Sequence, residues 1–143
     1  MSNENKIILQ RFFQELFNQG NLQAADELVA ANYLNHNAVP GETPGREGLK
    51  QFVTYIHSAW ADLHFVVEDQ IAEGDKVTTR FTITGTHQGE FAGIPATGKQ
   101  AVIRAINIHH VVDGKIQEAW LEWDALGMMQ QLEVVPGSGG NGA

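Results

Sequence analysis

The chain has 143 residues, of which 43% are hydrophobic and 18% charged, and it contains no cysteine. Such a length and composition predict one soluble globular domain, and the lack of cysteine excludes disulfides, thiolate metal sites and a thiol nucleophile. Seventeen acidic residues against nine basic ones give a net charge of −8, which argues against a nucleic-acid backbone as a partner.

Three amphipathic helices are predicted in the N-terminal part of the chain. Ser2 or Asn3 can cap the first helix. Its apolar residues recur with helical spacing on one broad face: Ile7, Ile8, Phe12, Phe13, Leu16 and Phe17. Asn21 can cap a shorter second helix that continues through Val29, and a third helix is predicted over residues 46–61.

From Leu63 onward the sequence alternates between apolar and polar residues, as β-strands do. The first strand leads to a turn at residues 73–75, and the second strand covers residues 76–87. A glycine-rich loop, residues 88–99, separates these strands from a hairpin over residues 101–124. The alternation therefore predicts a four-stranded, mostly antiparallel sheet.

The hairpin is the most informative stretch. Asp113-Gly114 separates its two alternating runs, and both residues tolerate the positive φ of a type I′ turn. A two-residue turn would place His109 opposite Glu118. One face of the hairpin would then carry six mostly polar residues: Asn107, His109, Glu118, Trp120, Glu122 and Asp124. The other face would carry Ile106, Ile108, His110, Ala119, Leu121 and Trp123. A bulge in either strand would swap the faces and exchange His109 for His110.

Helices followed by antiparallel strands predict an α+β fold. We expect the three helices to pack on one face of a long, curved sheet and to enclose a conical pocket. The opposite face, with Leu121 and Trp123, would be covered by a second subunit, so a homodimer or higher homo-oligomer is expected. This single domain is expected to cover residues 1–134 and to end in a flexible tail, residues 135–143.

Several other classes of protein are disfavoured. No run of the roughly 20 apolar residues that span a bilayer occurs, and the N-terminus lacks the apolar core of a signal peptide. A cytoplasmic location without a membrane partner is therefore expected. No His-x-His or His-x-x-x-His spacing occurs among the six histidines, so no metal site is expected. The three serines occur in no nucleophile elbow, which disfavours a Ser-His-Asp hydrolase.

The sequence also resembles a known family, the SnoaL-like polyketide cyclases or predicted ester cyclases. The longest matching motif is residues 85–99. Shorter motifs follow the family pattern in order: Asn35-His36, residues 59–64, residues 73–77, residues 113–120 with Asp124, and residues 127–132. The likeness covers roughly residues 5–132. This family belongs to the nuclear transport factor 2-like α+β cone superfamily, which agrees with the predicted architecture.

The resemblance implies a reaction. Polyketide members of the family close a ring of an aromatic polyketide methyl ester by intramolecular aldol condensation, without a metal or cofactor. By resemblance, Asp124 would be the acid/base, and His109 and Asn107 on the neighbouring strand would assist it. Asn35 or His36 would supply a further polar group. No cofactor is therefore expected.

The chemistry of these residues allows both catalytic and structural roles. A general base at Asp124 needs a carboxyl group that can hold a proton near neutral pH, which burial beside Trp120 and other acids would favour. The structural alternative is that Asp124 caps the turn at residues 125–127. His109 can bind a substrate carbonyl, or it can pair across the strands with Glu118.

Trp60, Phe91 and Trp120 are expected to be apolar walls of the pocket, and His87 is expected only to anchor the glycine-rich loop. We therefore expect a cofactor-free enzyme that cyclises or isomerises a small hydrophobic carbonyl or ester compound, in the lyase or isomerase class. One alternative is an epoxide hydrolase or dehydratase that uses acids paired around Arg80. Another is a binding module without catalytic activity.

Overall fold

The structure, a computed structural model, describes residues 2–38 and 40–134. In chain order its elements are α1 (Ser2–Arg11), the π-helix η1 (Phe12–Asn18), α2 (Gln23–Leu28), β1 (Val29–Asn35), α3 (Gly45–Ala59), β2 (Trp60–Glu73), β3 (Lys76–His87), β4 (Gln100–Val112), β5 (Lys115–Trp123) and α4 (Ala125–Gln131). The predicted tail, residues 135–143, lies outside the described residues. No helix in the described part of the chain is long and apolar enough to cross a membrane.

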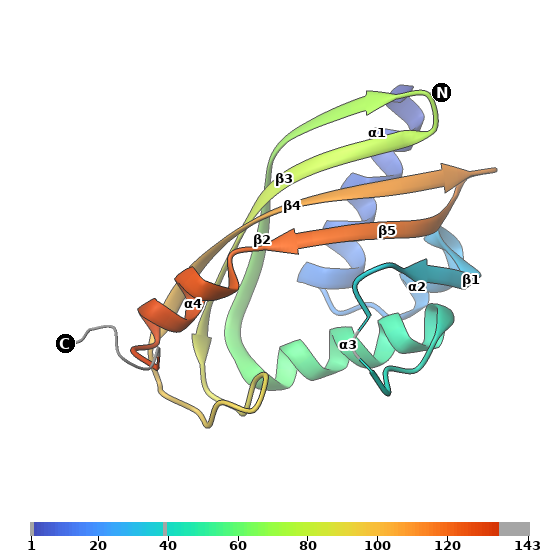
Figure 1. The fold of residues 1–143 in the computed structure, drawn as a ribbon. Coiled ribbons are helices and arrows are strands. Elements are labelled where there is room, and N and C mark those ends of the chain that lie inside the picture. Colours follow the sequence, from blue (N-terminus) through green and yellow to red (C-terminus); the bar gives the residue numbers. More distant parts are fainter. Residues whose placement is uncertain (1, 39, 135–143) are drawn as a thin grey trace.

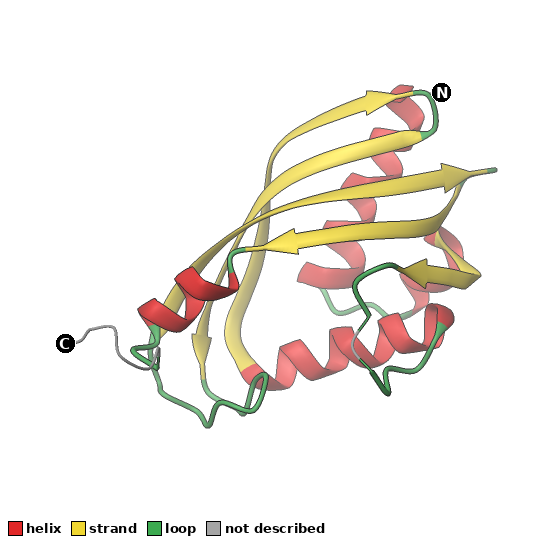
Figure 2. Ribbon diagram, viewed as in Figure 1, coloured by secondary structure: helices red, strands yellow, loops and turns green. Residues whose placement is uncertain are grey.

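The strands form one curved sheet in the order β1-β5-β4-β3-β2 (Figure 1). Neighbouring strands are antiparallel except for β1, which is parallel to β5. The sheet therefore has one strand more than predicted. Residues 29–35 form its edge strand, whereas the sequence predicts that Val29 ends a helix and predicts no strand for the residues after it. The N-terminal helices and α3 lie on one face of the sheet, as Figure 2 shows, so the predicted α+β architecture is confirmed.

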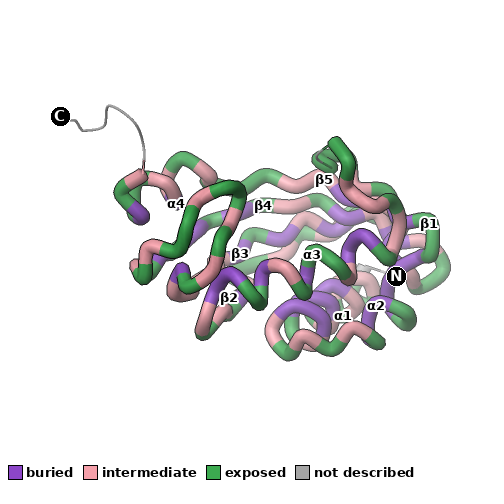
Figure 3. The backbone as a smooth tube through the Cα atoms, turned by 90° about the horizontal axis from the view of Figure 1, so that it is seen from below, coloured by how far each residue is buried: buried purple, intermediate pink, exposed green. Residues whose placement is uncertain are grey.

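The core lies between these helices and the sheet face toward them, which we call the inner face. Most residues of β3 and β4 on this face are buried: Val77, Thr79, Phe81, His87, Ala101, Ile103, Ala105, His109 and Val111. Figure 3 shows the resulting alternation of buried and more exposed positions along the strands. Aromatic rings of η1 close the core, with Phe13 4.7 Å from Phe81 and Phe17 5.0 Å from Phe65 between ring centroids. Each such buried ring stabilises the fold by roughly 1.5–3 kcal/mol.

The hairpin turn forms as predicted, but the register of the hairpin beyond it does not. Asp113 and Gly114 both have positive φ, 53° and 78°. Val111 pairs with Ile116, yet the next pair is His110 with Glu118, so the residue between Ile116 and Glu118 bulges out of the ladder. The predicted pairing of His109 with Glu118 is therefore wrong.

The bulge exchanges the two faces of β5. Asn107 and His109 lie on the inner face, now opposite Leu121 and Ala119. Glu118, Trp120 and Glu122 lie on the other, outer face. The prediction that Trp120 and His109 share a face is wrong, and so is the prediction that Leu121 and Trp123 lie on the outer face.

The closing helix α4 takes over the edge of β4 where β5 ends. The side chain of Gln131 donates to the Val102 carbonyl over 2.8 Å, and its amide oxygen accepts from the Val102 N–H over 2.6 Å. These bonds replace the strand partner that β4 loses. Met128 and Leu132 are buried beside them, so α4 is fixed to the sheet, and the residue between β5 and α4, Asp124, has a defined position.

Candidate functional site

Asp124 is the N-cap of α4. Its Oδ1 accepts a hydrogen bond of 2.8 Å from the Gly127 N–H, and its own N–H donates to the Arg104 carbonyl over 3.0 Å. A Cβ at position 127 would overlap the Asp124 carboxylate, which explains the glycine there. The expected burial of Asp124 is wrong, because the residue is exposed. Its second carboxylate oxygen, Oδ2, forms no hydrogen bond with any described residue.

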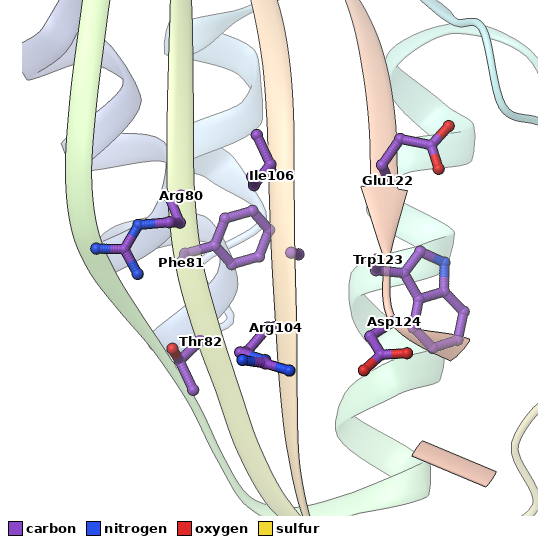
Figure 4. A pocket seen from close by; sticks show the side chains of 9 residues that line it. Arg80, Phe81, Thr82, Arg104, Ile106, Glu122, Trp123 and Asp124 are labelled. Atoms are coloured by element: carbon purple, nitrogen blue, oxygen red, sulfur yellow. The ribbon is translucent and has the colours of Figure 1, made fainter. Parts of the chain in front are cut away.

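Asp124 lines a groove of about 430 Å³ that spans β3, β4 and the end of β5 (Figure 4). The lining residues are Arg80, Phe81, Thr82, Arg104, Ala105, Ile106, Glu122, Trp123 and Asp124. Alternation along the strands places most of the polar members on the outer face. The carboxylate of Asp124 lies in this groove, at the point where β5 ends.

Besides Asp124 itself, two charged side chains of this groove have no ion partner among the described residues. They are Arg104 and Glu122, which extend from neighbouring strands. Arg80 is different, because it forms a salt bridge of 2.8 Å with Asp69 on β2.

His109 is 1% exposed, and its ring packs against the rings of Phe12 and Phe13 with centroid distances of 5.2 and 6.2 Å. Burial lowers the pKa of His109 to about 3, because the charged imidazolium would lose its hydration. Its Nδ1 atom is buried and has no hydrogen-bond partner among the described residues. His109 is therefore a neutral ring in the core at pH 7.

Asn107 lies two residues along β4 on the same inner face and is half-buried. Its Oδ1 accepts a 3.3 Å hydrogen bond from the Glu122 N–H, which leaves its NH₂ group without a partner among the described residues. The backbone of Asp124 is bonded to that of Arg104 on β4. Along β4, Asn107 is about 10 Å and His109 about 17 Å from Arg104. The structure therefore does not bring Asp124 and His109 together.

An aromatic cluster of Tyr55, Trp60, Phe91 and Trp123 lies next to Asp124 in the fold. Phe91, from the 88–99 loop, is 5.6 Å from Trp60, 5.7 Å from Tyr55 and 6.3 Å from Trp123 between ring centroids. Trp123 is 43% exposed although it lies on the inner face. The inner face is thus open to solvent beside Asp124. Sequence reasoning identified Trp60 and Phe91 but missed Tyr55 and Trp123, although Trp123 directly precedes Asp124.

The other predicted binding residues lie elsewhere. His36 stacks on Trp120 on the outer face, with a centroid distance of 4.5 Å and an interplanar angle of 6°. His36 Nε2 is 2.8 Å from Glu118 Oε1. Asn35 forms a local turn, because its Oδ1 accepts from the Asn37 N–H over 2.8 Å. Neither His36 nor Trp120 adjoins the aromatic cluster.

His110 completes the outer network. Its two ring nitrogens lie 2.8 Å from an Asp75 oxygen and 2.9 Å from a Glu118 oxygen. Hydrogen bonds to Asp75 and then to Glu118 raise the pKa of His110. His36 and then His110 lower the pKa of the Glu118 carboxyl. The network joins the β2–β3 turn to β4, β5 and the segment after β1, so its role here is structural.

Comparison with known proteins identifies relatives over most of the chain. The sequence model of the family described as SnoaL-like polyketide cyclase matches residues 7–132. The aklanonic acid methyl ester cyclase DnrD of Streptomyces peucetius is 31% identical over 131 residues, covering 89% of this chain and 90% of that protein. The nogalonic acid methyl ester cyclase of Streptomyces nogalater is 28% identical over 119 residues, covering 81% and 88%. Among solved structures, TsrD of Streptomyces laurentii superposes with a TM-score of 0.86 at 28% identity, covering 93% and 97%.

Proposed function

This chain belongs to the SnoaL-like polyketide cyclase family, and we propose that it closes a ring of a hydrophobic polyketide ester by an acid/base-catalysed, intramolecular aldol-type reaction. Its relatives indicate a polyketide cyclase. The observation that carries the finer proposal is the state of Asp124. One carboxylate oxygen accepts a hydrogen bond from the Gly127 N–H over 2.8 Å. The other forms no hydrogen bond with any described residue and lies in a groove that Trp123 also lines.

In the proposed reaction the free oxygen of Asp124 removes a proton from a carbon next to a substrate carbonyl. The enolate carbon then attacks a second carbonyl carbon of the same molecule, which forms the new carbon–carbon bond and an alkoxide. Asp124 returns its proton to that alkoxide, so the carboxylate is regenerated. The Gly127 N–H keeps the orientation of the carboxylate constant through both proton transfers.

Asn107 and His109 have different parts in this proposal. The NH₂ group of Asn107 is free to donate to a substrate oxygen about 10 Å from the backbone of Asp124, as an amide donor does in an oxyanion site. His109 lies two residues along β4 from Asn107 on the same face, buried and uncharged. We assign it the role of supporting the wall that carries Asn107. Trp60, Phe91 and Trp123 would hold the apolar body of the substrate.

The test uses aklanonic acid methyl ester and nogalonic acid methyl ester as substrates. Asp124→Asn should lower the turnover rate by about 10²- to 10⁴-fold, the usual contribution of a positioned acid/base, and should leave substrate binding nearly unchanged. Glu122→Gln, a carboxylate of the same groove, is the matched control and should remain active. Full activity of Asp124→Asn would refute the acid/base assignment. Binding of both esters by the wild-type protein without turnover would instead favour a binding module.

The epoxide hydrolase or dehydratase alternative receives less support. It needs acids around Arg80 that activate a water molecule. Arg80 forms its salt bridge with Asp69 at a distance of 2.8 Å, and both side chains are more than half exposed. A pair so exposed has little influence on the charge of a neighbouring group.

We also propose that a second copy of the chain covers the outer face of the sheet. Five aliphatic side chains on this face are 38–70% exposed: Val66, Ile71, Val102, Ile106 and Ile108. The unpaired Arg104 and Glu122 lie among them, so two such faces related by a twofold axis would be complementary in charge. Sedimentation velocity tests this: Arg104→Glu and Glu122→Arg should each shift the protein toward monomer, and the double variant should recover the dimer. A monomeric wild-type protein would refute it.

A further inference from the structure

His87 is a buried polar residue that the proposed reaction does not use. It ends β3 on the inner face, opposite Trp60 of β2, and is 0% exposed. The 88–99 loop holds its backbone, because its N–H donates to the Lys99 carbonyl and its carbonyl accepts from the Gly98 N–H, both over 2.8 Å. His87 does anchor this loop, as its position in the sequence suggests. Its side chain also carries a buried N–H group, which the loop positions.

The loop fixes which ring nitrogen of His87 carries the proton. The Thr97 N–H donates to Nδ1 over 3.3 Å, and the Thr97 hydroxyl oxygen lies 3.0 Å from the same atom. A backbone N–H can only donate, so Nδ1 must present its lone pair. The hydroxyl oxygen also accepts from the Lys99 N–H over 3.3 Å and is free to donate its own hydrogen to Nδ1. In the neutral ring the proton is therefore on Nε2.

The Nε2–H group has no acceptor in the part of the chain that the structure describes. Nε2 is buried and forms no hydrogen bond with any described residue. Nearly all buried donors in folded proteins have a partner, and a donor without one marks a place where a ligand can complete the bond. The ring lies 5.0 Å from the Trp60 ring, which in turn is 5.6 Å from Phe91. The unmatched donor thus belongs to the aromatic cluster.

We propose that the His87 Nε2–H donates a hydrogen bond to a carbonyl oxygen of a substrate packed against Trp60 and Phe91. This inference rests on the proposed function, which supplies a substrate that carries several carbonyl groups. The Asp124 N–H donates to the Arg104 carbonyl, and Arg104 pairs with Thr82 of β3. Because His87 comes five residues after Thr82, it lies about 17 Å along β3 from the level of Asp124. His87 therefore selects for a carbonyl remote from the reacting carbon and takes no part in proton transfer.

Two probes of equal ring size test this selection. Methyl anthraquinone-2-carboxylate has two ring carbonyls, and methyl anthracene-2-carboxylate has none. Tryptophan fluorescence titration gives the dissociation constant of each probe, and the ratio of the two constants measures the preference for the anthraquinone ester. This preference should be about 3- to 10-fold larger for the wild-type protein than for His87→Phe, because one net hydrogen bond contributes about that much. The control is His64→Phe, which changes an exposed histidine of β2 paired with Thr84 and should keep the wild-type preference.

A second measurement does not depend on the folding of a variant. In ¹H–¹⁵N spectra of the wild-type protein, the His87 Nε2–H resonance should move downfield on addition of the anthraquinone ester and stay in place with the anthracene ester. An unmoved resonance, or a preference that His87→Phe retains, would overturn the inference and leave the proposed function intact. Failure of the wild-type protein to bind either probe or to convert either polyketide ester would overturn the proposed function and this inference with it.

Discussion

Replacing His109 with leucine should remove a specific part of the acid sensitivity of the fold. His109 is buried among Phe12 and Phe13, and burial lowers its pKa from 6.5 to about 3. The same side chain in the unfolded protein is hydrated and titrates near 6.5. Between these two values the unfolded state binds a proton that the folded state does not bind. The free energy of unfolding must therefore fall as the pH is lowered through this window.

The magnitude follows from the width of the window. Each pH unit below 6.5 and above about 3 costs about 1.4 kcal/mol for one such group. At pH 5, about 1.5 units into the window, His109 should have removed about 2 kcal/mol of the stability present at pH 7.5. The leucine side chain does not titrate, so His109→Leu should lack this loss. At pH 7.5 the exchange should cost little, because the buried Nδ1 that it removes has no partner among the described residues.

Urea unfolding followed by tryptophan fluorescence at pH 7.5 and pH 5 measures the effect. For each protein, the measured quantity is the change in unfolding free energy between the two pH values. This change is then compared between the wild type and the variant. His64→Leu, an exposed histidine on β2, is the control and should lose as much stability as the wild type. If His109→Leu and the wild type lose equal free energy on acidification, His109 is not buried and neutral in the folded protein, and the reasoning fails.

Three further changes test other parts of the structure. Gly127→Ala should displace the Asp124 carboxylate from its cap and lower stability by about 1 kcal/mol, measured by thermal unfolding; an unchanged melting temperature would contradict the close contact. His110→Gln should destabilise the protein more at pH 6 than at pH 9. Asp75 and Glu118 raise the pKa of His110, so the stabilisation is complete below its ordinary pKa and is lost as the pH rises through the raised one; a difference independent of pH would count against the network. Gln131→Leu should accelerate hydrogen exchange of the Val102 amide, because this amide donates a hydrogen bond of 2.6 Å to the Gln131 side chain. Unchanged exchange would show that another group protects the amide.

Much of the sheet could be predicted because strand alternation and turn chemistry are local signals. Asp113-Gly114 specified the hairpin correctly, with positive φ at both residues. A bulge was left open as an alternative, but its position after Ile116 was not predicted, because the register was continued unbroken from the two-residue turn. The sequence does carry a sign of it. Ile116 and Ala119 are three residues apart, whereas the later inner-face residues of β5, Leu121 and Trp123, follow at intervals of two. An apolar spacing of three within a strand fits a bulge.

The edge strand β1 had no comparable local signal. Residues 29–32 are Val-Ala-Ala-Asn, a stretch that continues the preceding helix as readily as it begins a strand. Its conformation depends on parallel pairing with β5, where Val29 pairs with Ile116 and Asn35 with Ala119. These partners are more than 80 residues away in the sequence. A propensity read from neighbouring residues does not contain that information.

The candidate site could be predicted by residue type but not by distance. Asp124, Asn107 and His109 were selected as one polar face, yet β4 separates them by about 10 and 17 Å, measured along the strand from the level of Asp124. Groups spaced so far apart can be contacted together only by a long substrate. A one-ring ketone at Asp124 reaches neither Asn107 in one direction nor His87 in the other. A long fused-ring ester can touch Asp124 with its reacting carbon while its remote carbonyl groups reach these donors. In the reaction proposed above, those remote contacts would supply binding energy that holds the reacting carbon beside the exposed Asp124 carboxylate. A bound substrate that covers Asp124 would also remove the water that weakens a carboxylate as a base.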